Sequence, residues 1–400
     1  MAGAFGGCGA VGSATVVSVI YLDHAATSPL APEVAEAMGP WLTAGAVGNA
    51  SSLHAAGRAA RAAVEDARDR VAAALGVTPL EVLFTSGGTE ADNQAIKGLV
   101  WAARQAGTGT DVVTTAIEHH AVLETCEWLR NQEGVTVKVV GVGFDGVVDA
   151  DQVLSAVDGD TAVVSVMAAN NELGTIQPLD VIGPALAEQG VALHSDTVQA
   201  FGKIPLDLAG WQLTAASLSA HKFNGPTGVG VLVLRRDVAS HPVLHGGVQE
   251  RGVRSGTLNV AGIVGFGAAA ELTAGHQKAE QDRLTDLRDD LTACLTALDG
   301  VMLNGHPTLR LPNNVHVAVA ACDAEALLMD LDRRGVACST GSACQSGAAQ
   351  RSHVLDAIGA PTDAAHIRLS LGSTTSAEDV DQAGAIFGES VARLRGAAAA

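Results

Sequence analysis

The 400-residue sequence has few aromatic side chains, few basic ones and no long hydrophobic run. Aromatic residues make up 3% of the chain although hydrophobic residues make up 48%, so its core must consist mostly of Ala, Val, Leu and Ile. The formal net charge of −19 argues against unaided binding to nucleic acid or an anionic membrane, because neutralising phosphates requires clustered Lys and Arg. No apolar run reaches the ~20 residues that a membrane-spanning helix needs, so we expect no membrane partner.

Cysteines are scarce for this length and follow no regular spacing. We therefore predict no disulfide framework and expect a reduced, cytoplasmic protein. The first basic residue is Arg58, so residues 1–18 lack the basic start of a signal peptide, and we expect them to form a disordered extension. The cysteines are Cys8, Cys126, Cys294, Cys322, Cys338 and Cys344.

The middle of the chain alternates short β-branched runs with amphipathic stretches such as 89–105 and 118–132. This alternation predicts βαβ units and a mostly parallel sheet with helices on both faces. In such sheets ligands bind at the carboxyl ends of the strands. The strand-like runs are 81–85, 111–116, 135–142, 161–167, 191–195, 213–219 and 229–234.

The pattern of charged and apolar residues changes after about residue 270. A charged helical stretch over 277–298 precedes shorter strand-like and helix-like segments, which predicts a smaller α+β domain. Near its end lies "GVACSTGSACQSGAAQ" (335–350), where two cysteines stand among small residues. From composition alone this stretch could hold a nucleophile or a metal, or be a plain linker.

Polar side chains follow several predicted strands. "FTSGGTEADN" (84–93) places Gly88 and Thr89 at a helix start, where free N–H groups and the helix dipole suit a phosphate; an ordinary strand–helix turn is the alternative. Later strand ends carry His119 and His120, then Asn170 and Asn171, then Asp196 and Gln199. Because these strand ends meet at one edge of a parallel sheet, we expect one polar crevice there.

The segment "SLSAHKFNGPTGVG" (217–230) contains one of only five lysines. Lys222 follows a strand beside Ser219 and His221, whereas Lys203 lies in a turn, where we expect a solvated ammonium. A lysine that forms a Schiff base needs a shielded site that lowers its pKa. With Asp196 available for a pyridinium nitrogen, these parts predict a pyridoxal phosphate (PLP) enzyme.

With these motifs in hand, the sequence resembles the PLP-dependent cysteine desulfurases of the NifS/IscS type, within the class V aminotransferase superfamily. The resemblance runs from residue 21 to residue 372. It implies fold type I, with a large domain built on a mostly parallel seven-stranded sheet and a smaller α+β C-terminal domain. The implied parts are 19–31 joining the small domain, 32–270 as the large domain and 271–400 as the small domain with the catalytic cysteine loop. The shared motifs are "YLDHAATSP", "GNASSLH", "FTSGGTEADN", "EHHAV", "NNELG", "HSDTVQ", "SAHKFNGPTGVG", "HGGVQERGVRSGT" and "CSTGSACQSG".

The resemblance implies a role for each cofactor residue. Lys222 would hold PLP as a Schiff base, and Asp196 would keep the pyridine nitrogen protonated. Gln199 would hydrogen-bond the phenolic oxygen, while His119 would stack on the ring and assist proton transfer. The implied phosphate ligands are Gly88, Thr89, Ser219 and His221, with Thr257 reaching the neighbouring subunit's site.

The resemblance also implies how substrate and sulfur are handled. Asn171 and Arg368 would bind the carboxylate of L-cysteine, because the planar guanidinium matches a carboxylate. Cys344 matches the sulfur-accepting cysteine, which would carry a persulfide on a mobile loop to an acceptor protein. Cys338 has no motif role, and we expect it to pack. Gln249 replaces a histidine that is common in this family.

The resemblance thus implies a homodimeric cysteine desulfurase that supplies sulfur for iron–sulfur cluster assembly, tRNA thiolation or DNA phosphorothioation. Three alternatives remain. The chain could be a selenocysteine lyase or another class V transaminase, although a transaminase does not need Cys344. It could be a non-catalytic sulfur carrier, which the intact Lys222, Asp196 and Arg368 make a weaker hypothesis. A metal site at Cys338 and Cys344 lacks a second ligand pair, and we predict no metal.

Overall fold

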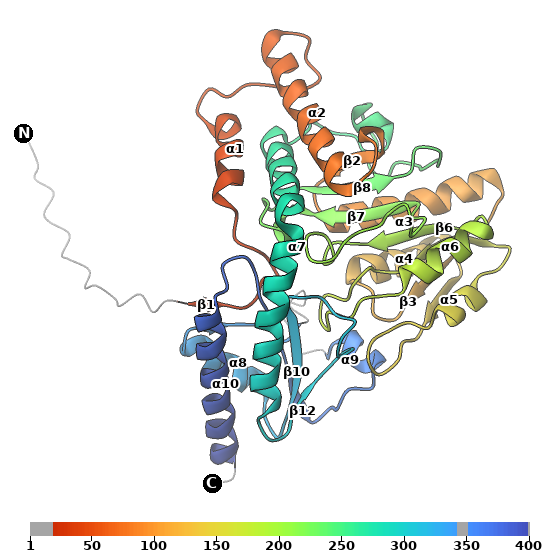
Figure 1. The fold of residues 1–400 in the computed structure, drawn as a ribbon. Coiled ribbons are helices and arrows are strands. Elements are labelled where there is room, and N and C mark those ends of the chain that lie inside the picture. Colours follow the sequence, from red (N-terminus) through yellow and green to blue (C-terminus); the bar gives the residue numbers. More distant parts are fainter. Residues whose placement is uncertain (1–18, 342–350, 399–400) are drawn as a thin grey trace, which may run out of the picture.

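The computed structural model describes residues 19–341 and 351–398, and its main element is a seven-stranded sheet (Figure 1). The strand order is β2-β8-β7-β6-β5-β3-β4, and only β8 runs antiparallel to its neighbours, β7 and β2. All seven predicted runs form strands of this sheet, so the predicted fold class is confirmed. The strands are β2 (Val82–Thr85), β3 (Asp111–Thr115), β4 (Val137–Val140), β5 (Thr161–Ser165), β6 (Ala192–Asp196), β7 (Ala215–Ser219) and β8 (Gly230–Leu234).

Helices cover both faces of this sheet because successive strand residues point to opposite sides. In β2, Val82 and Phe84 pack into one apolar cluster with α2 (Ala55–Leu75), α6 (Leu179–Glu188) and the start of α7 (Val260–Thr296). Leu83 packs on the other face with α3 (Gly88–Ala106) and α4 (His120–Glu133). The sheet is therefore buried on both sides, as its near-continuous apolar runs predict. Two further helices are α1 (Pro32–Leu42) and α5 (Ala150–Ala156).

A second sheet of three antiparallel strands lies beside the lower half of α7 (Figure 1). Its order is β12-β10-β9, and a separate apolar cluster packs it against the helices. The N-terminal strand β1 (Ile20–Tyr21) pairs in parallel with β11 (Val336–Ala337), so the start of the described chain joins this part of the fold. The other elements are β9 (Val301–Leu303), β10 (Asn314–Ala320), β12 (Ala364–Ser370), α8 (Ala324–Arg333), α9 (His353–Ala357) and α10 (Ala377–Ala398).

Helix α7 connects the two parts and begins 17 residues before the predicted start at residue 277 (277 − 260). The expected start was wrong because the first turns are apolar and glycine-rich, without the charged face that marks the later turns. A Cβ on Gly267 would lie 2.7 Å from Ala67 Cα, so glycine permits close packing of α7 on α2. The predicted domain boundary at residue 270 falls inside this helix, and the domain division stays a prediction.

Among the described residues, we find no helix whose length and hydropathy suit a bilayer crossing.

Candidate active site

The predicted site residues gather at the carboxyl edge of the large sheet. A cavity of about 330 Å³ opens there, within the size range of small-molecule sites. Ten of the twelve residues predicted from the sequence line it, contributed by the ends of five strands and by β12. The ten are Gly88, Thr89, His119, Asn171, Asp196, Gln199, Ser219, His221, Lys222 and Arg368.

The first wall of the cavity is the start of α3. Within the described part of the chain no side chain caps this helix, so its first N–H groups have no side-chain acceptor there. A Cβ on Gly88 would lie 2.9 Å from Val198 Cγ2, so only glycine leaves this space open. Glu90 holds the turn because it accepts a 2.8 Å hydrogen bond from Ser86 N and pairs with Arg254 at 2.7 Å. The result is an open anion cradle.

Two buried carboxylates form the floor. Asp196 is 7% exposed and accepts a 2.9 Å hydrogen bond from Val198 N, and Asp92 is 1% exposed. Burial raises the pKa of Asp92 to about 6, and burial together with the Asp92 charge raises that of Asp196 to about 6. Within the described residues, neither carboxylate pairs with a lysine or arginine. The floor therefore offers a binding position for a cation.

Asp92 was not predicted as a site residue. The available signal was helical spacing, since Asp92 stands four residues before Ile96 and seven before Leu99, both buried on α3. An acid on such an apolar face is unusual without a partner. His194 lies 3.5 Å from Asp92 Oδ1, but burial lowers its pKa to about 4, so this contact is not an ion pair at neutral pH.

Asp92, His119 and Asp196 also have ligand atoms within 4.8 Å of one another, a spacing compatible with a metal ion. The metal interpretation accounts for these three groups. It does not account for the lysine, the arginine and the anion cradle that line the same cavity. A charged organic ligand with an acidic group uses all of them.

Lys222 enters the cavity from a short 3₁₀ turn, Ala220–Lys222, that follows β7. Its Nζ donates hydrogen bonds of 2.7 Å to the carbonyls of Ala25 and Ala26. Behind it, Lys203 is only 6% exposed and donates to the Lys222 carbonyl at 3.1 Å. The expectation of a solvated Lys203 was wrong, because its turn packs under the Lys222 turn and burial, with the Lys222 charge, lowers its pKa to about 7.

A second cavity, of about 440 Å³, lies on the Lys203 side and shares Lys222 with the first. None of the other predicted site residues in the described part of the chain lines it. The smaller cavity, where the predicted groups converge, is therefore the candidate active site.

The part of the cavity formed by the start of α3, Asp92, Asp196 and Lys222 is called the cofactor side. Three further polar side chains complete it. His119 caps α4, where its Nδ1 accepts a 3.1 Å hydrogen bond from Ala121 N. Gln199 Nε2 donates to the Ala25 carbonyl at 3.0 Å. His221 Nδ1 lies 3.2 Å from Thr27 Oγ1, and burial followed by the Lys222 charge lowers its pKa to about 4. These contacts orient each of the three side chains.

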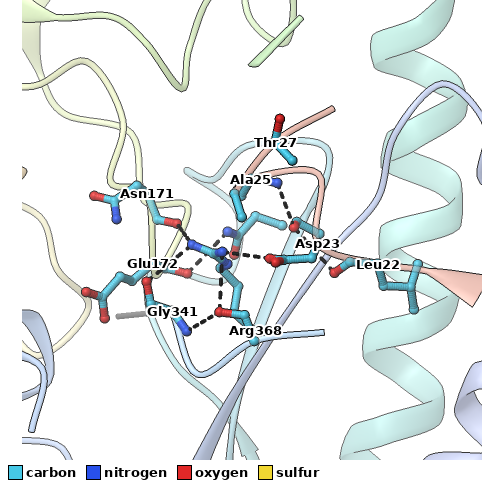
Figure 2. A network of polar contacts seen from close by, with 12 residues as sticks. Leu22, Asp23, Ala25, Thr27, Asn171, Glu172, Gly341 and Arg368 are labelled. Carbon is cyan, nitrogen blue, oxygen red and sulfur yellow. Dashed lines mark hydrogen bonds and ion pairs between the residues drawn. The ribbon is translucent and has the colours of Figure 1, made fainter. Parts of the chain in front are cut away.

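Arg368 lies on β12, lines the cavity and is 2% exposed, and Figure 2 shows it with Asp23, Asn171 and Gly341 around it. Its terminal nitrogens donate to the Asn171 carbonyl and to Asp23 Oδ1, each at 2.8 Å. Longer contacts reach the Gly341 carbonyl at 3.4 Å and Ser339 Oγ at 3.5 Å. In the described contact with Arg368, the main-chain carbonyl of Asn171 thus accepts the hydrogen bond.

Of the predicted site residues that the structure describes, only Thr257 does not line the cavity. Thr257 is exposed in the loop before α7, and Gly256 N in this loop donates to Gln249 Oε1 at 3.1 Å, so Gln249 braces the loop. Cys344 lies outside the described residues, as do Cys8 and residues 1–18. Cys338 is partly buried against the small-sheet cluster, and burial raises its pKa to about 12, as a packing cysteine requires.

A lysine, an acid floor and an anion cradle at the strand ends of a doubly covered sheet define a class, the fold type I enzymes that use PLP. Residues 20–383 match the family model described as "Aminotransferase class-V". The chain belongs to the class V aminotransferase family, whose members depend on PLP, as the resemblance predicted.

Individual relatives are similar over nearly the whole chain. An "IscS-like cysteine desulfurase" of Mycobacterium tuberculosis (strain ATCC 25618 / H37Rv) is 48% identical over 387 residues, which cover 95% of this chain and 98% of the relative. A "Cysteine desulfurase IscS" of Methanosarcina thermophila is 45% identical, covering 94% and 93%. A solved structure of a "NIFS-LIKE PROTEIN" aligns with a TM-score of 0.87 at 36% identity, covering 94% of this chain and all of that one.

Proposed function

We propose that this protein is a cysteine desulfurase that takes the sulfur of L-cysteine, releases L-alanine and carries the sulfur as a persulfide on Cys344. The observation that carries the proposal is the convergence of Lys222, Asp196 and Arg368 on one cavity with an anion cradle. A lysine for the cofactor, an acid for its ring and an arginine for an amino-acid carboxylate are the groups that this reaction requires. The names of the similar relatives support the same activity.

The cavity residues fit PLP. Gly88, Thr89, Ser219 and His221 are the proposed phosphate ligands, and the cradle that Gly88 keeps open supplies backbone donors for the dianion. Asp196 would hold the ring nitrogen, which would give this buried carboxylate a cationic partner. When bound, PLP withdraws electrons from the substrate carbons and so permits proton loss from Cα and departure of the thiol sulfur from Cβ.

The residues of the chain position the substrate and move its protons. Arg368 takes the carboxylate in a fork-like contact, and Asn171 lies beside it. Lys222 would be the base that removes the Cα proton of the substrate. The Ala25 and Ala26 carbonyls, which accept from Nζ at 2.7 Å, hold the lysine near the cavity during this step. His119 assists proton transfer at the sulfur.

The sulfur step balances without an added oxidant. The Cys344 thiolate attacks the substrate sulfur, the Cβ–S bond breaks and an S–S bond forms. Protons from the two thiols and from Cα account for the hydrogens of L-alanine and of the persulfide. In the sequence, Cys344 follows Gly341 by three residues, and Gly341 lines the cavity (344 − 341).

The wider setting is part of the proposal. The enzyme acts as a homodimer in the cytoplasm, and Thr257, on a loop that does not line its own cavity, contributes to the phosphate site of the second subunit. The persulfide passes to an acceptor protein, for iron–sulfur cluster assembly, tRNA thiolation or DNA phosphorothioation. The net charge of −19 supports a protein acceptor over direct nucleic-acid contact.

The test is to measure L-alanine and protein-bound persulfide after adding L-cysteine to the PLP-loaded protein. Cys344→Ala should retain the cofactor absorbance but lose persulfide and at least about 100-fold in desulfuration, because the attacking thiolate is gone. Cys338→Ala is the matched control and should remain active. Lys222→Ala should lose the normal cofactor absorbance.

Unchanged sulfide release by Cys344→Ala would overturn the role of that cysteine. Parallel assays with selenocysteine and with amino-donor and keto-acid pairs distinguish a selenocysteine lyase or a transaminase.

A further inference from the structure

The N-terminal segment Asp23–Thr27, within the motif "YLDHAATSP", lies between the two ends of the cavity. The sequence assigns no role to it. Its Ala25 and Ala26 carbonyls accept hydrogen bonds from Lys222, and Thr27 Oγ1 lies 3.2 Å from His221. At its other end, Asp23 pairs with Arg368 (Figure 2). One short segment therefore contacts both the cofactor lysine and the substrate arginine.

Strand β12 fixes the position of this segment. Ser370 N donates to the Leu22 carbonyl at 2.7 Å, and Ala25 N donates to Ser370 Oγ at 2.9 Å. Arg368 and Ser370 are two residues apart, so their side chains leave the same face of the strand. Asp23 is therefore held beside Arg368 by hydrogen bonds of its neighbours Leu22 and Ala25 with Ser370, which do not depend on the Asp23 side chain.

The contacts of Arg368 fall into two groups. The short ones, to Asp23 and to the Asn171 carbonyl at 2.8 Å, have the geometry of charge-assisted and ordinary strong hydrogen bonds. The long ones, to Gly341 at 3.4 Å and to Ser339 at 3.5 Å, lie at or beyond normal hydrogen-bond length. One long contact belongs to each terminal nitrogen. A ligand carboxylate that replaces both long contacts is held by both terminal nitrogens at once.

We infer that Asp23 is a positioning residue for substrate recognition: it fixes the guanidinium of Arg368 so that both terminal nitrogens meet the substrate carboxylate. This inference rests on the proposed function. A buried arginine without a carboxylate partner carries a large desolvation cost. Asp23, whose side chain is 21% exposed, offsets that cost before substrate arrives and keeps the fork oriented. Preorganisation of this kind lowers the ordering cost of binding.

Two variants of the PLP-loaded enzyme test the inference. Asp23→Asn keeps the shape and an acceptor oxygen but removes the charge, and Asp23→Ala removes both. For L-cysteine we expect KM to rise about tenfold in Asp23→Asn and further in Asp23→Ala, with kcat within about twofold of the parent. Calorimetric affinity for L-alanine should fall by a similar factor, while affinity for ethylamine, which lacks the carboxylate, should not change.

Asp237→Asn is the control, because Asp237 forms an exposed ion pair with Arg235 away from the cavity. Equal losses for L-alanine and ethylamine would show a general structural role and overturn the inference. Unchanged or tighter L-alanine binding would also overturn it, since Asp23 would then be neutral or a competitor of the substrate. If the parent enzyme makes no L-alanine from L-cysteine, the proposed function fails, whereas the calorimetric comparison still decides the role of Asp23.

Discussion

The two sides of the cavity differ in whether their buried charged groups have partners of opposite charge. The cofactor side holds Asp92 and Asp196 with no lysine or arginine partner in the described chain, and burial raises the pKa of each. The substrate side holds Arg368, which already has a carboxylate partner in Asp23. The buried carboxylates of the cofactor side thus lack a lysine or arginine partner among the described residues until a cation binds. On the substrate side the charge of Arg368 is already paired with Asp23, and a substrate carboxylate needs to replace only the two long contacts of Arg368.

This difference separates the proposed roles of the two ligands. A cofactor that stays bound can supply a permanent charge, so the protein need not supply one. A substrate that binds and leaves in each turnover is better served by an arginine that keeps its orientation between turnovers. Variants on the two sides should therefore change different measurements.

The largest expected effect is that of Arg368→Lys, which removes the guanidinium from the substrate side. Lysine keeps the charge but loses the planar fork that serves Asp23, Asn171 and the substrate together. We expect kcat/KM for L-cysteine to fall about 100-fold, while PLP affinity stays within about threefold. Alanine formation and cofactor absorbance measure the two effects. A matching loss of PLP affinity would contradict the separation of the two sides, and thermal melting controls for folding.

Gly88→Ala should disturb only the cofactor side. The added Cβ lies 2.9 Å from Val198 Cγ2, and the stiff β-branched valine cannot easily turn away. We expect PLP to bind about tenfold more weakly while KM for L-cysteine at saturating PLP changes less than twofold. Gly39→Ala in α1, where a Cβ meets nothing within 4 Å, is the control. An altered KM with unchanged PLP affinity would refute this expectation.

A smaller effect, on stability, should appear at Glu118, which binds the main chain of Met167, a residue that lines the cavity. Glu118 is fully buried and accepts hydrogen bonds from Thr115 Oγ1 and Met167 N, and burial raises its pKa to about 8. The unfolded chain releases this proton near pH 4.5 but the folded chain retains it, so the contribution of Glu118 to folding stability should fall as pH rises from about 4.5 to 8.

Glu118→Gln should remove that dependence and make the cofactor-free protein more stable than its parent at pH 8 by on the order of 3 kcal/mol, with little difference at pH 4.5. Urea unfolding at the two pH values measures it. The exposed Glu124→Gln on α4 is the control. A stability difference between Glu118→Gln and its parent that is the same at pH 8 and at pH 4.5 would argue against a raised pKa of Glu118.

Much of the cofactor side could be predicted from the sequence, because each residue follows a recognisable strand in a parallel sheet. Lys222 after β7 and Asp196 at the end of β6 are examples: knowing the strand is enough to place the residue at the shared edge. Lys203 was misjudged because a turn in the sequence does not reveal what packs above it. Asp92 was missed because its burial depends on which face of α3 lies against the sheet.

The substrate side had weaker local signals. Arg368 was predicted from the resemblance, but the sequence gives no reason to pair it with Asp23, which lies 345 residues away. That contact exists because the N-terminal segment runs beside β12. The start of α7 was likewise hidden, since its first turns carry no polar face.

By itself, the sequence determined the strand–helix alternation, the polar strand ends and the motifs of the family, because these depend on residue type and short spacings. Only the tertiary structure decided which charges are buried together and which are paired. Burial and pairing depend on distances between segments far apart in the chain, and these distances set both the raised pKa values of the acid floor and the fixed orientation of Arg368.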